Sequence, residues 1–517
     1  MKKVLSLKLK PSEAVDHNFI NRLIESETGI PKNTVTGFSI LKKSIDARSR
    51  QPYVNLSIEA FINEPFIDRP KVIIDFPEVS RSTKKNIIIG AGPAGLFAAL
   101  RLIENGIKPV ILERGKDVKS RRRDLAVLNK EGIINPESNY CFGEGGAGTY
   151  SDGKLYTRST KRGDVNRILN LLVQFGADER ILYESHPHIG TNKLPQIITS
   201  IREKIIACGG EIHFNKKVVD LEINDHKIKS VLTEDDNKFI GDNVMLATGH
   251  SARDIFLLLT NKKINIEFKP FALGVRVEHP QSLIDTIQYH CDTRDPFLPP
   301  SSYNLVHQAD GKGVFSFCMC PGGIIATAST NKEELVVNGW SPSKRNNPFA
   351  NSGIVVSVEQ KDIAAFKKDG PLAGMYFQQE IEQKAFKAGG GKFVAPAQRL
   401  VDFCTNKFSQ SLPDCSYLPG IQTAELKNVL PSFILDRLKA GLSEFGKKMK
   451  GYYTNEAVVV ATESRTSSPV RILRDTERLS HPQIKNLFPC GEGAGYAGGI
   501  VSAAMDGEKI ASIISVS

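Results

Sequence analysis

The sequence has 517 residues, of which 40% are hydrophobic and 24% are charged, and its net charge is +11. A chain of this length is expected to divide into roughly two to four domains. Its apolar stretches are shorter than the roughly 20 residues that span a bilayer. Polar and apolar residues alternate at its N-terminus, whereas a signal peptide contains a continuous apolar run. Its eight cysteines lack framework-like spacing, which favours free thiols. These features exclude membrane-spanning and disulfide-rich secreted proteins, and we expect a cytoplasmic protein without a membrane partner.

Residues 1–80 are predicted to form a small α+β domain. Alternating polar and apolar residues predict strands over 4–9, 35–44 and 53–62. Apolar residues at helical spacing predict a helix over 15–24. This β-α-β-β order begins a ferredoxin-like sandwich. Four basic residues cluster around one strand connection, namely Lys42, Lys43, Arg48 and Arg50. The default interpretation of this domain is a structural or oligomerisation module, and nucleic-acid binding is the alternative.

The stretch from 85 to 114 has the pattern of a dinucleotide-binding β-α-β unit. Apolar runs predict buried strands over 86–89 and 108–112, with a helix over 93–104 between them. Gly90 permits the turn after the first strand, Gly92 lets the backbone approach a pyrophosphate, and Gly95 lets the helix pack close to the strand. Glu113 ends the second strand, where its carboxylate can accept the ribose hydroxyls.

The N-terminus of the helix over 93–104 is expected to bind the phosphates. Its unpaired N–H groups and the positive end of its dipole favour an anion there. Pro93 suits the first helical turn, where its missing N–H costs nothing. Ala94 in the same turn and Arg114 beside Glu113 are further predicted cofactor contacts.

Residues 141–155 form a second glycine-dense stretch with too few large side chains for a core element. Glycine at this density allows close backbone approach to a flat ligand, and Ser151, Asp152 and Lys154 supply polar ends. A flexible surface loop is the alternative. The predicted ligand contacts here are Gly145, Gly146, Gly148, Ser151, Asp152 and Gly153.

Residues 194–249 are predicted to bring the chain back beside the first strand. A helix is expected over 194–208, followed by strands over 211–219, 223–232 and 238–246. Ala247-Thr248-Gly249 then closes the last strand with another backbone turn at the cofactor. The predicted contacts in this part are Val219, Thr248 and Gly249.

Residues 261–458 are predicted to form an inserted β-rich domain that contacts the substrate. The patterning there indicates strands, proline-rich loops and few regular helices, with the clearest β segments at 268–277 and 313–330. Cys318 and Cys320 are spaced C-x-C, and they either remain free thiols or form a redox or substrate-contacting pair. No recognisable zinc spacing accompanies them, so no metal site is expected.

The stretch 487–507 again predicts a strand, a glycine turn and a helix. Only ten residues follow Gly507, so this segment is expected to complete the existing sheet instead of forming an independent unit. Glu492 is expected to bind the sugar-like chain of the cofactor as an anion, while the helix beginning near Gly498 directs its N-terminus at a flavin ring. The predicted contacts here are Gly491, Glu492, Gly498, Gly499 and Ile500.

Six motifs carry a family resemblance: residues 90–95, 141–155, 247–254, 317–323, 464–471 and 490–507. Together they resemble the two-dinucleotide-binding-domain flavoproteins, specifically the family of uncharacterised FAD-dependent dehydrogenases, over residues 85–517. The resemblance implies a glutathione-reductase-like FAD domain of Rossmann type in an α/β protein. It implies that the adenosine half lies on the first glycine turn and Glu113, and the flavin half on the second glycine stretch and Glu492. The C-x-x-C of disulfide reductases is absent.

The expected organisation is an N-terminal domain over 1–80, an FAD-binding domain over 81–260 and 459–517, and a substrate domain over 261–458. The first hypothesis is an FAD-dependent oxidoreductase that transfers hydride or electrons through flavin N5, with NADH or NADPH as candidate transient reductants. Arg465 and Arg471 are candidates for holding an anionic small-molecule substrate. His186 and His188 are candidate proton donors. Ordinary ion pairs and structural histidines are the alternatives for these four residues.

Two further hypotheses come from other functional classes. One is a flavoprotein that binds or modifies RNA through the N-terminal domain, and the other is a binding protein in which FAD is structural. The sequence leaves the oligomeric state undetermined.

Overall fold

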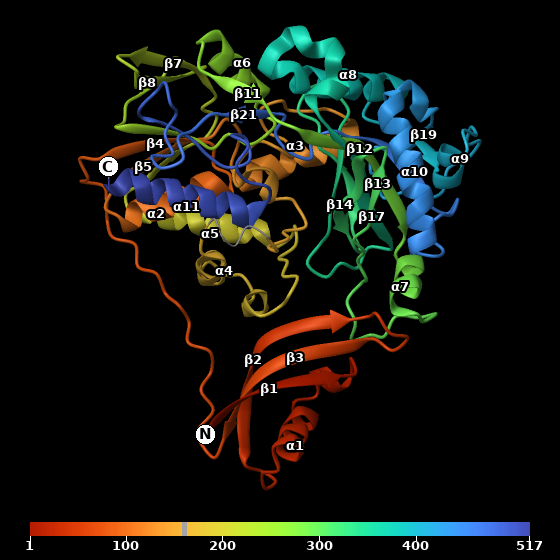
Figure 1. Ribbon diagram of the computed structural model, residues 1–517. Helices are drawn as coiled ribbons and strands as arrows, with labels where there is room; N and C mark the ends of the chain where they lie inside the picture. Colours follow the sequence, from red (N-terminus) through yellow and green to blue (C-terminus); the bar gives the residue numbers. More distant parts are fainter. Residues whose placement is uncertain (158–162, 517) are drawn as a thin grey trace.

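The computed structural model describes residues 1–157 and 163–516. Its main sheets have three, five and seven strands. Figure 1 shows the N-terminal sheet below the rest of the molecule, and the five-stranded and seven-stranded sheets in two adjoining parts above it. In the part of the chain that the structure describes, every helix is too short or too polar to cross a membrane.

The N-terminal unit has the predicted β-α-β-β order. It consists of β1 (Lys2–Leu9), α1 (His17–Thr28), β2 (Val35–Asp46) and β3 (Tyr53–Ile62). The strands pair antiparallel in the order β1-β3-β2, which is the order of the first three strands of a ferredoxin-like sandwich. Ile20 and Ile24 of α1 are buried against this sheet. Residues 63–84 then lead to the main body as an extended connection (Figure 1).

The five-stranded sheet is parallel and confirms the Rossmann-like prediction. Its order is β22 (Leu487–Pro489), β10 (Asn243–Leu246), β4 (Lys85–Ile89), β5 (Lys108–Leu112) and β6 (Glu211–His213). Because β22 pairs with β10, the last stretch of the chain completes the sheet that the first glycine turn opens, as expected.

Helices α2 (Pro93–Glu104), α5 (Leu194–Ala207) and α11 (Ile500–Val516) pack together beside the parallel sheet (Figure 1). A Cβ atom on Gly507 would lie 2.1 Å from the carbonyl oxygen of Ala94, so only glycine lets α11 approach α2 this closely. The further helices of this part are α3 (Val118–Glu131), α4 (Val165–Gln174) and α6 (Arg253–Asn261).

The connection from α5 back to β10 contains shorter and more numerous strands than the sequence predicted. All three expected strands are interrupted, giving β6, β7 (Val218–Asn224), β8 (Lys227–Thr233), β9 (Lys238–Phe239) and β10. The first is interrupted at Asn215 and the second at Asp225 and His226, because these residues adopt positive φ angles that end the extended runs. Strands β7, β8 and β9 form a separate antiparallel meander.

The seven-stranded sheet holds the middle of the chain. Its order is β13 (Val306–Ala309), β14 (Lys312–Cys320), β17 (Phe349–Val358), β12 (Phe271–Pro280), β20 (Val458–Glu463), β18 (Ala395–Arg399) and β19 (Ile421–Thr423). Two small pairs accompany it, β15 (Ile324–Thr327) with β16 (Val337–Trp340) and β11 (Ile266–Phe268) with β21 (Val470–Ile472). Since β20 belongs to this sheet, the chain returns to the FAD-type part only after Glu463.

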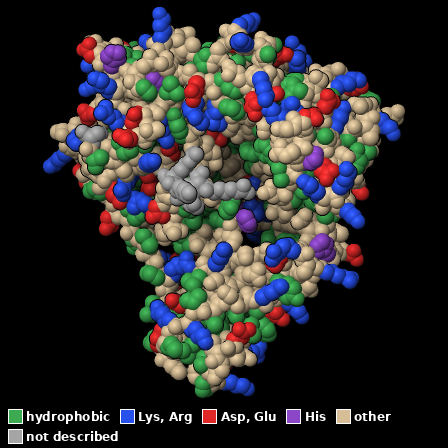
Figure 2. Space-filling model, in the orientation of Figure 1, with side chains coloured by type: hydrophobic (Ala, Val, Ile, Leu, Met, Phe, Trp, Pro, Cys, Tyr) green, Lys and Arg blue, Asp and Glu red, His purple; other side chains and the backbone are tan. Residues whose placement is uncertain are grey.

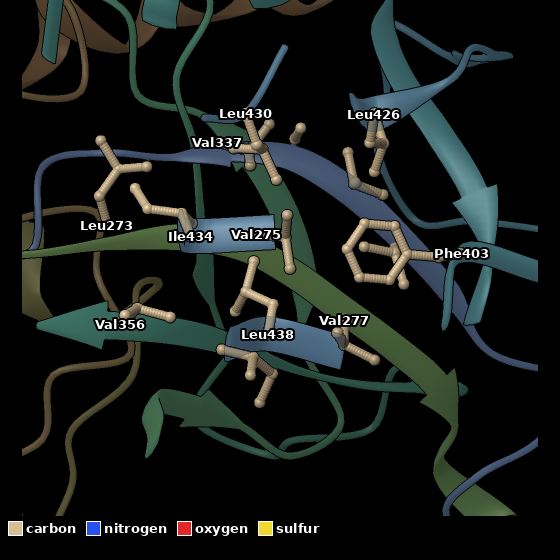
Figure 3. Packing of buried hydrophobic residues seen from close by; sticks show 14 of the residues in the cluster. Leu273, Val275, Val277, Val337, Val356, Phe403, Leu426, Leu430, Ile434 and Leu438 are labelled. Atoms are coloured by element: carbon tan, nitrogen blue, oxygen red, sulfur yellow. The ribbon is translucent and has the colours of Figure 1, made fainter. Parts of the chain in front are cut away.

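The prediction of few regular helices in residues 261–458 is wrong. This part contains α7 (Gln281–Tyr289), α8 (Ala373–Ala388), α9 (Leu400–Cys404) and α10 (Ser432–Lys448). Figure 3 shows Ile434 and Leu438 of α10 among Val275, Val277 and Val356 of the sheet. Ile434, Leu438, Leu442 and Phe445 of α10 are buried at the i, i+4, i+8, i+11 spacing of an amphipathic helix, a pattern that the sequence contains and the strand assignment overlooked.

The N-terminal unit docks on the main body through backbone hydrogen bonds. The N–H of Lys43 in β2 donates to the carbonyl oxygen of Tyr183 at 2.8 Å, and the N–H of Ser185 donates to the carbonyl oxygen of Lys43 at 2.9 Å. The same segment continues to His188, which forms a β-bridge with Lys154. The edge of β2 is therefore connected, through residues 183–188, to the second glycine stretch.

Candidate cofactor and substrate cavity

A cavity of about 410 Å³ lies between the carboxyl ends of the parallel strands and the seven-stranded sheet. In open parallel sheets this edge is where ligands bind. Figure 2 shows the surface hollowed near the middle of the displayed face, above the N-terminal unit. Seventeen of the predicted cofactor contacts line the cavity: Gly90, Gly92, Pro93, Ala94, Glu113, Arg114, Gly146, Gly148, Ser151, Asp152, Gly153, Thr248, Gly249, Glu492, Gly498, Gly499 and Ile500.

The first glycine turn has the tight geometry that its sequence predicts. Gly90 has a φ of +108°, and a Cβ atom there would lie 2.4 Å from the carbonyl oxygen of Ala247. A Cβ atom on Gly95 would lie 2.1 Å from the carbonyl oxygen of Gly90, so this glycine serves close helix packing and does not itself line the cavity. Gly92 is the N-cap of α2, whose first N–H groups are free to bind an anion.

Glu113 has a structural task that the sequence analysis did not predict. Its Oε1 accepts hydrogen bonds from the N–H groups of Gly115 and Gly143, both at 2.9 Å, and its Oε2 accepts one from Ala91 at 2.9 Å. The carboxylate thus ties the first glycine turn to the second glycine stretch. A carboxylate has about four acceptor positions, so Oε2 retains one position for a ribose hydroxyl.

Arg114 lines the cavity but is held by protein groups. Its guanidinium pairs with Glu137 at 2.6 Å and with Asp254 at 2.8 Å, and it lies 4.2 Å from the centre of the Phe142 ring. These contacts fix the wall of the cavity beside Glu113.

The second glycine stretch packs directly on the first turn. The N–H of Gly145 donates to the carbonyl oxygen of Ala91 at 2.8 Å, and a Cβ atom on Gly146 would lie 3.2 Å from the Cα of Gly92. Glu144 and Thr149 are fully buried, which contradicts the alternative of a flexible surface loop. Gly145 lies behind the lining, where a Cβ atom would overlap the Thr149 hydroxyl at 1.9 Å.

Besides Gly95 and Gly145, two further predicted contacts do not line the cavity. Val219 is 43% exposed, while its neighbour Val218 is buried and lines the cavity. Successive strand residues face opposite sides, so the prediction was one residue out of register. Gly491 lies behind Cys490 and Glu492, and its N–H donates to Asp506 at 2.8 Å.

The predicted anion-holding role of Arg465 and Arg471 is not supported by their surroundings. Arg465 reaches the cavity, but its guanidinium pairs with Glu382 at 2.8 Å and Glu334 at 3.1 Å. Arg253, which is only partly buried, pairs with the same two carboxylates, so the two positive and two negative charges balance one another. Arg471 lies outside the lining, where its guanidinium packs 5.6 Å from the centre of the Tyr496 ring.

The two candidate proton donors also lie outside the lining. His186 packs against Tyr156 with the ring centres 5.1 Å apart. The Nε2 of His188 lies 3.2 Å from the carbonyl oxygen of Ser343. Burial, together with the charge of Arg345, lowers the pKa of His188 to about 4, so its ring is neutral at physiological pH. His188 therefore does not fit the predicted role of a proton donor near pH 7.

Cys318 and Cys320 are close to the cavity and to Lys154. Cys318 lines the cavity and Cys320 is fully buried. The Nζ of Lys154 lies 3.7 Å from each sulfur. Both cysteines are free thiols in this structure.

Glu492 differs electrostatically from the expectation. Burial raises its pKa to about 7, even though the charge of Lys269 acts in the opposite direction. This direction is opposite to the expectation that the nearby helix N-terminus keeps the carboxylate anionic. Near pH 7 the group is divided between its neutral and anionic forms.

Several lining residues were missed by sequence reasoning: Phe317, Asn338, His250 and Thr466. His250 and Phe317 lie in the motifs at 247–254 and 317–323, but no local pattern marks the side chain that faces a cavity. Burial and the charge of Arg465 lower the pKa of His250 to about 4. Among the residues that the structure describes, no group of three or more His, Cys, Asp or Glu side chains could hold a metal ion.

Comparison with known families divides the chain into three matched segments. Residues 84–238 match the family model described as "FAD binding domain", and residues 270–466 match "FAD-dependent protein, C-terminal domain-like". Residues 1–61 match a domain of unknown function. The chain thus carries an FAD-binding domain, and the glycine turns described above lie within or beside it.

One relative is similar over nearly the whole length. An uncharacterized protein of Clostridium beijerinckii (strain ATCC 51743 / NCIMB 8052) is 40% identical over 514 residues, covering 96% of this chain and 95% of that protein. Among solved structures, a glycine oxidase from Bacillus cereus ATCC 14579 is 13% identical, with coverages of 84% and 95% and a TM-score of 0.30. A geranylgeranyl bacteriochlorophyll reductase-like protein from Thermoplasma acidophilum is 12% identical, with coverages of 84% and 78% and a TM-score of 0.35. Likeness at these TM-scores carries no argument about function.

Proposed function

The chain belongs to the same family as the Clostridium beijerinckii protein, a family with an FAD-binding domain, and from this premise we propose that it is an FAD-dependent oxidoreductase acting on a small molecule. The observation that carries the proposal is the cavity itself. It begins at the first glycine turn and ends against β14 of the seven-stranded sheet, so one opening joins an FAD-type phosphate site to a separate wall of polar side chains.

The residues of the FAD-type part suit the successive groups of the cofactor. The first turn of α2 at Gly92 and Pro93 would hold the pyrophosphate, and the free acceptor position of Glu113 would bind the adenosine ribose. Glu492 and the segment before α11 would bind the chain hydroxyls and the ring. When bound, FAD supplies hydride or electron transfer at its N5 atom.

The residues of the opposite wall are proposed to receive the substrate. Phe317 and Cys318 of β14, together with Asn338 of β16, face the same cavity as the glycine turns. Because this wall belongs to different strands from the glycine turns, its side chains can differ between substrates without altering the part of the cavity proposed to bind the cofactor. This arrangement supports the proposal that residues 261–458 are the substrate domain.

The test is an anaerobic titration of the purified holoprotein with NADH and then NADPH while the flavin absorbance is recorded. A protein that carries FAD should be yellow, and bleaching by a nicotinamide would establish a reductase half-reaction. Lack of bleaching by both would require a reductant derived from the substrate. A purified protein that has no flavin and takes up none from added FAD would overturn the proposed function.

A further inference from the structure

The end of β14 has an unusual backbone that brings two sulfurs together. Its pairing with β17 is interrupted between Phe317 and Cys320, and Cys318 adopts a φ of +46°. This left-handed conformation is uncommon for a residue other than glycine and is often retained at functional sites. The bulge turns Cys318 toward the cavity while Cys320 stays buried behind it.

Three cations and three carboxylates lie around the two sulfurs. The charged groups of this cluster are Lys154, Arg276 and Arg345 with Asp152, Glu463 and Glu492. Arg276 is fully buried, and its Nη2 lies 3.4 Å from the Cys320 sulfur while its Nη1 pairs with Glu463 at 2.7 Å. Arg345 and Lys154 share Asp152, at 2.9 and 3.3 Å.

Asp152 faces two of these cations, because it pairs with both Lys154 and Arg345, whereas Glu463 pairs with Arg276. A buried charge without a counter-charge is costly. A thiolate beside Lys154 supplies a second negative charge for Lys154 and Arg345.

The pKa values of the two thiols are shifted in opposite directions, as expected of one nucleophilic cysteine and one partner cysteine. The Cys320 Sγ donates to the carbonyl oxygen of Cys318 at 3.3 Å. The neighbouring Cys320 thiol, followed by the charges of Lys154 and Arg276, holds the pKa of Cys318 well below its usual range. The same contact with Cys318, together with burial, holds the pKa of Cys320 above its usual range. Cys318 is thus the cavity-facing thiolate and Cys320 the thiol behind it.

We propose that Cys318 and Cys320 form a dithiol–disulfide centre at the cavity wall, with Cys318 as the nucleophile, and that its substrates are thiols and disulfides. In exchange with a disulfide RSSR, the Cys318 thiolate forms an S–S bond to one sulfur and RS⁻ leaves. The Cys320 thiol then loses its proton and attacks the Cys318 sulfur, which releases the second RS⁻. The products are the Cys318–Cys320 disulfide, RSH and RS⁻, so atoms and charge balance.

The electron partner of the pair is the flavin, and this part alone rests on the proposed function. The thiol and thiolate together give up two electrons and one proton when they form their disulfide, and FAD, when bound, would supply the two-electron acceptor. Closing so short a ring strains the disulfide, and strained disulfides are the readily reduced kind that serve in catalysis. The pair differs in spacing from the C-x-x-C of disulfide reductases, which this sequence lacks.

The first experiment measures thiolate reactivity on the intact protein. Iodoacetamide labelling at pH 6 to 8, followed by peptide mass spectrometry, gives a separate rate for each cysteine. Cys291 is the matched reference because it is also half-buried, while burial and its acidic neighbours raise its pKa. At pH 7 Cys318 should react roughly tenfold faster than Cys291. Equal rates would overturn the proposal.

Lysine variants test whether the ammonium of Lys154 maintains the thiolate. Lys154→Met should shift the pH profile of Cys318 labelling upward, whereas Lys154→Arg, which keeps the positive charge, should retain the wild-type profile. A profile that Lys154→Met leaves unchanged would overturn the role of Lys154. Thermal unfolding of each variant checks that the fold is retained.

The second experiment tests disulfide chemistry. After incubation with oxidised glutathione, the wild type should contain a Cys318–Cys320 disulfide, and Cys320→Ser should trap a glutathione mixed disulfide on Cys318. Cys291→Ser is the control and should behave as the wild type. A pair that remains reduced, or a mixed disulfide trapped elsewhere, would overturn the proposal.

Reduced dithiothreitol under anaerobic conditions then tests the link to the flavin. It should bleach the flavin in the wild type and in Cys291→Ser, but much more slowly in Cys318→Ser and Cys320→Ser. The same slow rate in all four proteins would overturn the flavin link. If the protein lacks FAD, the proposed function fails while the labelling and trapping experiments still decide the cysteine pair.

Discussion

Glu492 illustrates how strongly position alters the chemistry of one side chain. It lies in a glycine turn where a carboxylate can bind the hydroxyl chain of FAD, yet burial raises its pKa to about 7. Binding of hydroxyl donors favours the anion, because an anionic carboxylate is the stronger acceptor. We therefore interpret Glu492 as a cofactor contact whose strength depends on pH.

Glu492→Gln should make FAD affinity independent of pH, since the amide does not titrate. In the wild type FAD affinity should rise between pH 6 and 8 as the carboxylate ionises. At pH 8 the variant should bind FAD about 1.5–3 kcal/mol more weakly, the value of one charge-assisted hydrogen bond. Fluorescence titration of the apoprotein measures this. Flavin reduction should stay near normal with excess FAD, and a fall of orders of magnitude would instead place Glu492 in the chemistry.

Gly92 allows a second prediction about one residue. A Cβ atom there meets nothing closer than the Cα of Gly146 at 4.0 Å, so Gly92→Val should fold. The added methyl groups nevertheless occupy the space in which the backbone approaches the pyrophosphate. FAD should be lost from the purified variant. Gly313→Val, in β14 away from the cavity, is the control and should remain yellow, whereas undiminished FAD in Gly92→Val would contradict the assignment of the turn.

At the level of elements, the N-terminal sheet is better explained as a docking module than as an RNA-binding surface. Arg48 pairs with Asp46 through two hydrogen bonds of 2.8 Å, which cancels part of the basic cluster. The backbone of Lys43 pairs with residues 183–185 of the main body. Figure 2 shows Lys and Arg on the displayed face of this unit interspersed with Asp and Glu.

Replacing the basic cluster tests this interpretation. The combined variant of Lys42, Lys43, Arg48 and Arg50 to Ala should retain as little RNA as the wild type in low-salt filter binding. If the cluster recognises phosphates, the wild type should bind RNA with an affinity that falls steeply as the salt concentration rises, and the variant should lose this binding. The latter result would favour the RNA-binding hypothesis.

At the level of the whole molecule, a buried ion cluster joins the two adjoining parts of the main body. Arg253 of α6 and Arg465 pair with Glu334 and with Glu382 of α8. Burial acts to raise the pKa of Glu382, but the charges of Arg253 and Arg465 lower it to about 2. This carboxylate therefore stabilises the folded state above its unfolded pKa, and the contribution is lost as pH falls through about 2.

Glu382→Gln should lower the free energy of unfolding by about 3–5 kcal/mol at pH 7, because two guanidinium groups lose a buried counter-charge. Glu380→Gln, on the exposed face of the same helix, is the control and should change it by less than about 1 kcal/mol. Urea denaturation measures both. The Glu382→Gln variant should also lose less stability than the wild type as the pH falls from about 4.5 toward 2, and equal losses would refute this role of Glu382.

The sequence by itself determined the features that depend on neighbours along the chain. The first strand, the glycine turn and the helix at 93–104 were predictable, because Gly90 adopts a positive φ angle and Gly95 must clear the nearby carbonyl oxygen of Gly90. The same holds for the β-α-β-β unit and for the last segment, which was too short to form a sheet of its own. Helices α8 and α10 were missed, although Ile434, Leu438, Leu442 and Phe445 of α10 have apolar helical spacing in the sequence.

The tertiary structure alone decided which polar side chains face one another. Arg465 was expected to hold an anion, but Glu334 and Glu382 come from distant parts of the chain and neutralise it. Lys154 meets Cys318 and Cys320 across 164 and 166 residues of sequence. The charge state of a group depends on burial and on such distant partners, whereas strand, turn and helix depend on backbone geometry within a few residues. That physical difference is why the cofactor turns could be predicted from the sequence and the sulfur–lysine cluster could not.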